Sequence, residues 1–261
     1  MKTDIFKNPK LNFIELRYVN EIPECTKMHL HEEITLTALK EGSLNLIFND
    51  VSLKLLPNEV GIINNNIPHC ASTNTISKCG YVLYINQKYL KYLNLNFNAP
   101  YKVIKQKDIY KSFIKLCDCL LNKKISLIEK EEHFYSFCLF LFSSEIKEDY
   151  TSIKPTLAFD IKNYLDENYL EEFTLEDLAV EFSLSAVHLI RVFKKEIGLP
   201  IHSYVLNKKV HKAKELIAEN ISIVEVALSS GFFDQSHLNR SFKRIFQITP
   251  KEYQSSIFSK C

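Results

Sequence analysis

The chain has 261 residues, enough for two domains of ordinary size. Its 33 Lys and Arg against 31 Asp and Glu give a net charge of +2, which excludes a strongly basic coat or an acidic tail. Hydrophobic residues make up 46% and charged residues 25%, as in folded globular proteins, and five Gly with eight Pro leave little room for flexible linkers.

The cysteines and the apolar runs indicate neither a secreted protein nor a membrane protein. The seven Cys contain no C-x-x-C pair, and no apolar run follows Met1, so we expect a cytoplasmic location. The apolar run 137–142 is far shorter than the roughly 20 residues that span a bilayer. Cys117 and Cys119 are expected to be buried thiols. We predict no cofactor and no catalytic residues.

Short runs of alternating apolar and polar residues occupy the chain from about residue 11 to 85, which is the period of half-buried β-strands. The runs are 13–19, 34–39, 44–48, 51–55, 60–63 and 81–85. Many short strands separated by turn sequences predict a small sandwich or barrel within residues 1–100.

From about residue 106 to 147 the apolar spacing becomes that of helices. The second helical stretch, 125–146, is apolar around most of its circumference, which favours burial on two sides. We therefore predict a helical dimerisation segment over 101–150 and a homodimer. The pattern lapses near 148–152, where we place a domain boundary, and everything after Pro155 is predicted to be helical. The expected fold is α+β and multidomain.

The last ninety residues contain an internal repeat. Capping-box sequences, which satisfy the free donors at a helix start, occur at 174–177 and again 48 residues later at 222–225. The motif L-x-R-x-F-K at 189–194 recurs 49 residues later at 238–243, so the second turn is one residue longer. A short capped helix, a tight turn and a second helix form a helix-turn-helix.

The two units are predicted at 174–196 and 222–246, and both have the same small residues after the capping box. Ala179 and Ala227 suit the crossing of two helices, and Ser183 and Gly231 fall in the turns that follow. The connector between the units has an apolar stripe over about 19 residues. At 1.5 Å per residue it is roughly 28 Å long, close to the pitch of B-DNA, so it could place the second helices of the two units in successive major grooves.

In the second helix of each unit, one face is expected to pack on the core. That face holds Leu189, Phe193 and Glu196 in the first copy and Leu238, Phe242 and Ile245 in the second. The opposite faces are predicted to meet DNA through Val187, Ile190, Arg191, Lys194, Gln235, Ser236, His237, Asn239, Arg240 and Lys243.

Different contacts are expected from different side chains on these faces. Val187 and Ile190 suit thymine methyl groups, and Arg191 suits guanine or phosphate. Lys194 and Lys243 are expected on phosphates. Positive charge is concentrated here, since residues 183–261 carry 12 basic and 6 acidic side chains, a net charge of +6.

Residues 174–253 resemble the DNA-binding domain of the AraC/XylS family of bacterial transcription regulators. The most specific piece is Gly231-Phe232-x-x-Gln235-Ser236-x-Leu238-x-Arg240-x-Phe242-Lys243, followed by Thr249-Pro250-x-x-Tyr253. The resemblance implies binding to promoter DNA and activation through contact with RNA polymerase. The family usually has Arg where this chain has Lys209, which changes one structural or phosphate contact.

Residues 10–90 resemble the cupin barrel that precedes the DNA-binding domain in many family members. Its candidate effector-binding residues are His29, His31, Glu33 and His69. Three interpretations remain open: a pocket for a small-molecule effector, which we favour, a metal such as Zn²⁺, or plain surface residues. The alternative function is a cupin-type metalloprotein or metalloenzyme with a helical DNA-binding tail.

Overall fold

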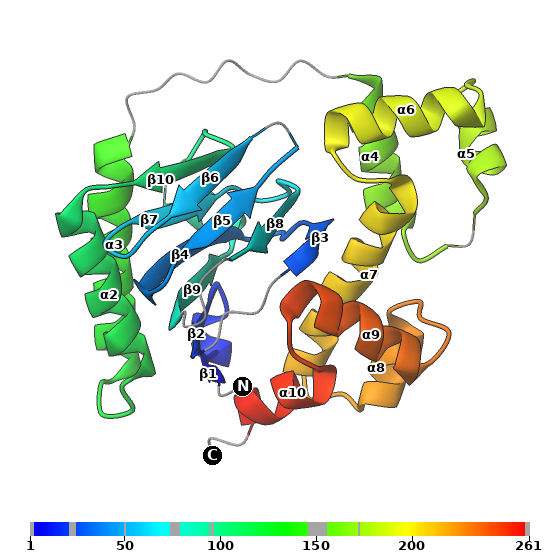
Figure 1. Ribbon diagram of the computed structural model, residues 1–261. Coiled ribbons are helices and arrows are strands. Elements are labelled where there is room, and N and C mark those ends of the chain that lie inside the picture. Colours follow the sequence, from blue (N-terminus) through cyan, green and yellow to red (C-terminus); the bar gives the residue numbers. More distant parts are fainter. Residues whose placement is uncertain are drawn as a thin grey trace. The chain divides into compact units, whose positions relative to one another are not determined.

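The computed structural model describes residues 3–20, 25–49, 51–73, 79–93, 95, 97–145, 156–171 and 173–258. Its contacts divide the chain into two compact units, an N-terminal one made mainly of Met1–Thr26 and His31–Thr151 and a C-terminal one made mainly of Ser152–Ser259 together with Lys27–Leu30 (Figure 1). The boundary predicted near 148–152 lies outside the described residues. Within the described ranges, no helix combines the length and the apolar character that crossing a membrane requires.

The N-terminal unit contains two sheets whose described strand pairs are antiparallel. The larger has the order β1 (Thr3–Phe6), β2 (Ile14–Val19), β9 (Cys79–Ile85), β4 (Ile34–Glu41), β7 (Val60–Ile63) and β10 (Tyr101–Ile104). The smaller has the order β3 (Cys25–His29), β8 (His69–Ser72), β5 (Leu44–Ile47) and β6 (Ser52–Leu55). A short 3-10 turn, Pro9–Leu11, and helix α1, Gln87–Tyr92, connect strands.

All six predicted runs form strands, namely β2, β4, β5, β6, β7 and β9. The alternation did not reveal β1, β3, β8 or β10, because these strands are short and carry several polar residues. Strand β10 corrects the expectation that residues from 101 onward are helical. Tyr101 pairs with Ile63 of β7, so a division at residue 100 would separate an edge strand from its sheet.

Helices α2 (Lys107–Leu121) and α3 (Leu127–Glu145) pack against each other, and α2 contacts strands of the six-stranded sheet. Phe113 of α2 and Phe134 of α3 are fully buried in the same apolar cluster as the sheet. On the other side of α3, Leu139 is 54% exposed and Phe140 46% exposed. Cys117 and Cys119 are buried as predicted, and burial raises the pKa of both thiols.

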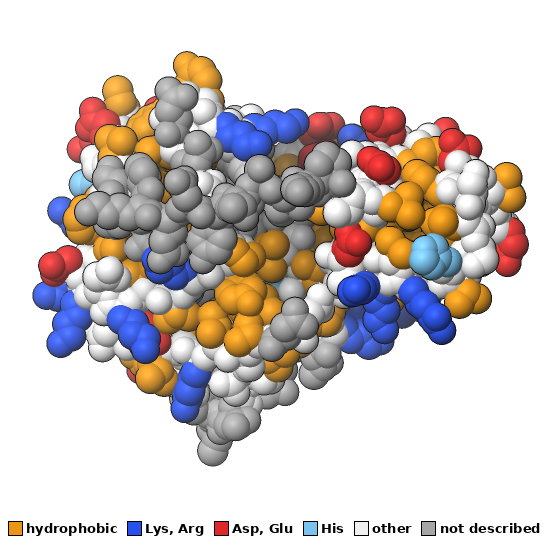
Figure 2. All heavy atoms as spheres, turned by 90° about the horizontal axis from the view of Figure 1, so that it is seen from above, with side chains coloured by type: hydrophobic (Ala, Val, Ile, Leu, Met, Phe, Trp, Pro, Cys, Tyr) orange, Lys and Arg blue, Asp and Glu red, His pale blue; other side chains and the backbone are white. Residues whose placement is uncertain are grey.

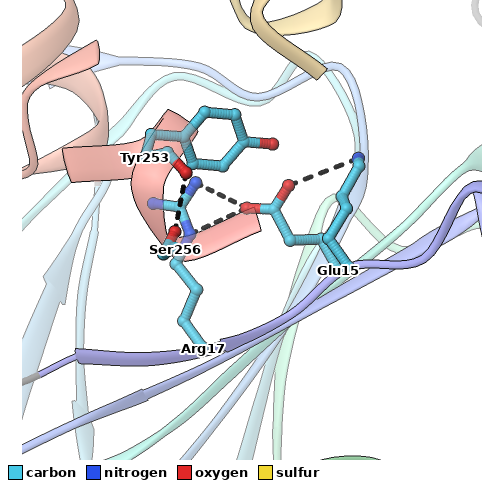
Figure 3. A network of polar contacts seen from close by, with 5 residues as sticks. Glu15, Arg17, Tyr253 and Ser256 are labelled. Atoms are coloured by element: carbon cyan, nitrogen blue, oxygen red, sulfur yellow. Dashed lines mark hydrogen bonds and ion pairs between the residues drawn. The ribbon is translucent and has the colours of Figure 1, made fainter. Parts of the chain in front are cut away.

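One buried ion pair stands out in strand β2. Glu15 and Arg17 are separated by two positions and therefore lie on one face of the strand (Figure 3). Arg17 Nη2 lies 2.6 Å from Glu15 Oε1, Arg17 Nε donates to the same oxygen at 2.8 Å, and Lys7 Nζ lies 3.4 Å from Glu15 Oε2. The pairing offsets the cost of removing both charges from water.

The C-terminal unit is helical in all its described elements. They are α4 (Leu157–Asn168), α5 (Leu175–Glu181), α6 (Ala186–Ile197), α7 (Ile201–Ala218), α8 (Ile223–Ser229), α9 (Gln235–Phe246) and α10 (Pro250–Phe258). Asp166 of α4 accepts hydrogen bonds from Lys162 and from the Tyr204 hydroxyl, both at 2.6 Å, with Lys208 Nζ at 3.5 Å. Burial would raise the pKa of Asp166, but these partners lower the pKa overall. Because Tyr204 and Lys208 belong to α7, the same contacts connect α4 to α7.

Candidate nucleic-acid interface

Helices α5 and α8 begin with the predicted caps. The Thr174 hydroxyl accepts from the Asp177 amide at 3.1 Å, and Asp177 Oδ2 accepts from the Thr174 amide at 2.8 Å, which completes a capping box. Ser222 accepts from the Glu225 amide at 3.3 Å. The backbone hydrogen bond to Asp177 also lowers the pKa of its carboxyl. Both helices therefore start with a side-chain hydroxyl cap, whereas the complete capping box that was predicted for both is recorded for α5 alone among the described helices of the repeat.

The two turns repeat each other in backbone conformation. Ser183 has φ 54° and Gly231 has φ 73°, so both occupy the left-handed region. In the first turn the Leu184 amide donates to Ala179 O at 2.8 Å, and in the second the Phe232 amide donates to Ala227 O at 2.9 Å. These paired bonds close helices α5 and α8 in the Schellman manner.

The second turn is one residue longer than the first, as predicted. Ser185 caps α6, two positions after Ser183, and its hydroxyl accepts from the His188 amide at 3.3 Å. Asp234 caps α9, three positions after Gly231, and its carboxylate accepts from the His237 amide at 2.6 Å. Helices α6 and α9 each have 12 residues.

The core faces of α6 and α9 agree with the prediction except at one position. Leu189, Phe193, Leu238, Phe242 and Ile245 are buried. Glu196 was predicted on the core face, and this was wrong. Glu196 is exposed and accepts a hydrogen bond from the Thr156 hydroxyl, while Ile197 is buried instead. A carboxylate gains more from an exposed hydroxyl partner than from apolar neighbours.

Most side chains predicted to meet DNA are exposed. Val187 is 62% exposed and Ile190 37% exposed. The other exposed members are Arg191, Lys194, Gln235, Ser236, Arg240 and Lys243. His237 and Asn239 are half-buried, and the His237 ring packs on Phe232 with 5.2 Å between centroids. An exposed apolar Val187 within a basic helix face fits a surface that meets another molecule.

Helix α7 connects the two units and has 18 residues, a length of about 27 Å. Lys209, which replaces the usual Arg, donates from Nζ to Gly231 O at 3.2 Å, so this side chain joins the connector to the second turn. The sequence pattern missed three polar residues of α7 that are buried, Asn207, His211 and Lys214. Their spacing of four and three places them on one helix face, which is the signal that could have found them.

Basic residues lie in the last turns of both α6 and α9. Lys194 and Lys195 lie in the last turn of α6, and Lys243 and Arg244 lie in the last turn of α9. On the part of the C-terminal unit seen in Figure 2, Lys and Arg side chains lie beside exposed hydrophobic and acidic ones. The basic last turns of α6 and α9 are the groups on this unit that would attract a polyanion.

Two of the candidate effector residues, His31 and His69, lie close together in the N-terminal unit, and both side chains are 5% exposed. Their burial favours a pocket or a metal site over plain surface residues. The His31 and His69 ring centroids are 5.3 Å apart, and His31 packs edge-on against Tyr84. Glu33 is half-buried.

His69 is held in a defined orientation. Its Nδ1 lies 2.8 Å from Ile67 O, so this nitrogen carries the proton and Nε2 is the basic nitrogen. Burial lowers the pKa of His69 to about 4, against a weaker opposing effect of the Ile67 hydrogen bond. The imidazole is therefore neutral near pH 7, the state in which a histidine accepts a hydrogen bond or binds a metal.

Comparisons with known proteins agree with this geometry. A family described as "Helix-turn-helix domain" matches residues 178–256. The transcriptional regulator YbfI of Bacillus subtilis is 27% identical over 221 residues, which cover 80% of each chain. The probable transcriptional regulator LumQ of Photobacterium leiognathi is 32% identical over 95 residues, 36% of this chain and 38% of LumQ.

The solved structure of ToxT from Vibrio cholerae O395 is similar over 98% of both chains, with a TM-score of 0.62 and 14% sequence identity. The likeness therefore extends over the N-terminal sheets as well as over the paired helix-turn-helix units. With these matches, residues 178–256 form a helix-turn-helix domain that is similar to those of transcription regulators, and the whole chain has the two-domain fold seen in ToxT.

Proposed function

We propose that the chain binds promoter DNA through α6 and α9 in successive major grooves. The observation that carries this proposal is the repeat itself: two units with matched caps and turns lie on one connector helix and expose their basic faces. A single such unit could serve as an ordinary protein-interaction module, whereas two matched units joined by a helix of about 27 Å suit successive major grooves of duplex DNA.

Selection from a random-sequence duplex pool by the full chain tests this. We expect an enriched site with two half-sites about one helical turn apart, and affinity that falls steeply with salt. Failure to enrich any sequence, or a single enriched half-site, would contradict the use of both recognition helices.

The N-terminal domain is proposed to bind the controlling effector at His29, His31, Glu33 and His69. A structure of ToxT holds an unsaturated fatty acid, which establishes that a protein of this fold takes a small molecule. The neutral His69, with Nε2 as acceptor, suits a hydroxyl or N–H group of the effector better than it suits a carboxylate. Thermal shift screening of the full chain against hydroxylated small molecules, with His69→Phe as control, tests this assignment.

A divalent transition metal is the second candidate for the same cluster. The buried His31 and His69, whose ring centroids are 5.3 Å apart, favour it, because neutral imidazole is a preferred ligand of Zn²⁺. Metal analysis of the purified full chain, repeated with His31→Ala and His69→Ala, separates the two candidates. Stoichiometric metal that disappears in both variants would assign the cluster to a metal.

We further propose a homodimer formed through α3, acting in the cytoplasm as an activator that contacts RNA polymerase. The exposed Leu139 and Phe140 support the dimer, since exposed neighbouring apolar side chains are the usual core of an interface. Family resemblance supports the other parts. Sedimentation of Leu139→Glu/Phe140→Glu against the unaltered chain tests the dimer, which should become monomeric in the variant.

A further inference from the structure

The C-terminal unit contains a groove between its two helix-turn-helix units. It has a volume of about 750 Å³, within the range of roughly 300–1,000 Å³ that is typical of small-molecule sites. Helix α7 supplies most of one wall, and α5, α6, α9 and the turn before α9 supply the rest. Its apolar lining includes Phe173, Leu175, Ile190, Ile201, Val205 and Phe232.

Binding to DNA does not account for this apolar lining. Most contacts between a protein and a duplex go to phosphates and sugars and are made by cationic and polar groups. The groove nevertheless includes Ile190 of α6 and His237 of α9, which are both among the residues proposed to face DNA. A molecule in the groove would therefore contact one recognition helix from each unit.

The charged groups of the lining do not favour an ion of either sign. Lys209 is the cation, and its Nζ already donates to Gly231 O at 3.2 Å. Asp177 and Glu171 are the carboxylates, and Asp177 accepts from both the amide and the hydroxyl of Thr174. An anion would meet two carboxylates and a cation would meet the lysine, so an uncharged molecule fits best.

Two imidazoles supply polar groups for orientation. His202, at the start of α7, is exposed and His237 is half-buried, so each can exchange a hydrogen bond with a hydroxyl or carbonyl group. A few polar groups in a mainly apolar lining is the usual composition of a small-molecule site.

We propose that this groove binds a small, uncharged, mainly apolar molecule and that its binding weakens binding to DNA. The weakening rests on the proposed function, because it requires that Ile190 and His237 face the duplex. The coupling is reciprocal, so DNA must lower the affinity for the molecule by the same factor. This site is separate in sequence from the histidine cluster of the N-terminal domain.

Titration of the full chain with the uncharged dye Nile red tests the groove. Val205→Trp would fill the groove, and Val192→Trp is the matched control, because both valines are half-buried against the same apolar cluster and Val192 does not line the groove. We expect Val205→Trp to lower dye affinity at least tenfold, and Val192→Trp to change it less than twofold. Thermal unfolding of both variants checks that each is folded.

The outcomes separate the groove from the proposed function. Equal dye affinity in the two tryptophan variants would overturn the groove site. An anionic naphthalene sulfonate is titrated in the same way. If it binds the unaltered chain as tightly as Nile red does, and if Val205→Trp but not Val192→Trp abolishes its binding, the assignment of an uncharged molecule is wrong. With the dye bound, affinity for the selected duplex should fall at least threefold in the unaltered chain and not in Val205→Trp. If Val205→Trp loses dye binding and the unaltered chain binds no DNA, the groove site stands and the proposed DNA-binding function is refuted.

Discussion

Ser183 and Gly231 occupy equivalent left-handed positions in the two turns, so opposite substitutions at these positions should change stability in opposite directions. A side chain in this backbone region costs about 1–2 kcal/mol relative to glycine, and glycine loses about 0.4–1 kcal/mol more entropy on folding. Ser183→Gly should therefore stabilise the first unit by about 0.5 kcal/mol. Gly231→Ala should destabilise the second unit by the same conformational amount, with an added cost from Lys209.

The added cost follows from the distance between the turn and the connector. A Cβ built on Gly231 would lie 3.1 Å from both Cε and Nζ of Lys209, tighter than ordinary contact. The lysine would have to move and give up its 3.2 Å hydrogen bond to Gly231 O, a loss of about 0.5–1 kcal/mol for an exposed bond. Gly231→Ala should thus cost about 1–2 kcal/mol in total.

Hydrogen exchange followed by mass spectrometry measures the two units separately in the full chain. Gly231→Ala should accelerate exchange in α8 and α9, and Ser183→Gly should slow exchange in α5 and α6, with each change confined to its own unit. Urea unfolding followed by circular dichroism gives the total change. An alanine at 231 that costs nothing, or a glycine at 183 that costs as much as the alanine, would refute the argument from backbone conformation.

Arg240→Ala should weaken binding to the selected duplex by about 1–3 kcal/mol and leave binding to a scrambled duplex unaffected. Lys243→Ala should weaken binding to the two duplexes equally and reduce the slope of log affinity against log salt concentration by about 1. Fluorescence anisotropy measures both variants. Thr174→Ala should cost about 1 kcal/mol in urea unfolding and more than Ser222→Ala, because Thr174 belongs to a complete capping box. For His69, the folded pKa of about 4 lies below the ordinary 6.5, so the folded state resists protonation. The free energy of unfolding should therefore fall by about 3 kcal/mol between pH 6.5 and 4. His69→Phe should lack this pH-dependent loss, and urea unfolding across that range measures both.

The repeat illustrates how far local sequence carries the argument. Thr174 and Asp177 cap a helix through bonds between residues three apart, and the left-handed turns at Ser183 and Gly231 are closed by bonds within six residues. Such features depend only on neighbours along the chain. The prediction of both units therefore agreed closely with the structure, and Glu196 was misplaced because its partner, Thr156, lies 40 residues away.

The N-terminal domain shows the opposite case. Strands β1, β3, β8 and β10 were missed, since a short strand gains its stability from the partner with which it pairs and not from its own alternation. The ion pair of Glu15 and Arg17 was missed for a related reason. A charged residue in a strand is normally solvent-facing, and only the folded sheet shows that Glu15 is 1% exposed and paired.

By itself, the sequence determined the fold class, the doubled helix-turn-helix and the concentration of positive charge on the C-terminal helices, because helix period, caps and composition are local properties. Only the tertiary structure decided that His31 and His69 are buried side by side and that a groove lies between the two helix-turn-helix units. Both features join residues distant along the chain, and burial and cavity shape arise only once the packing of all the intervening elements is fixed.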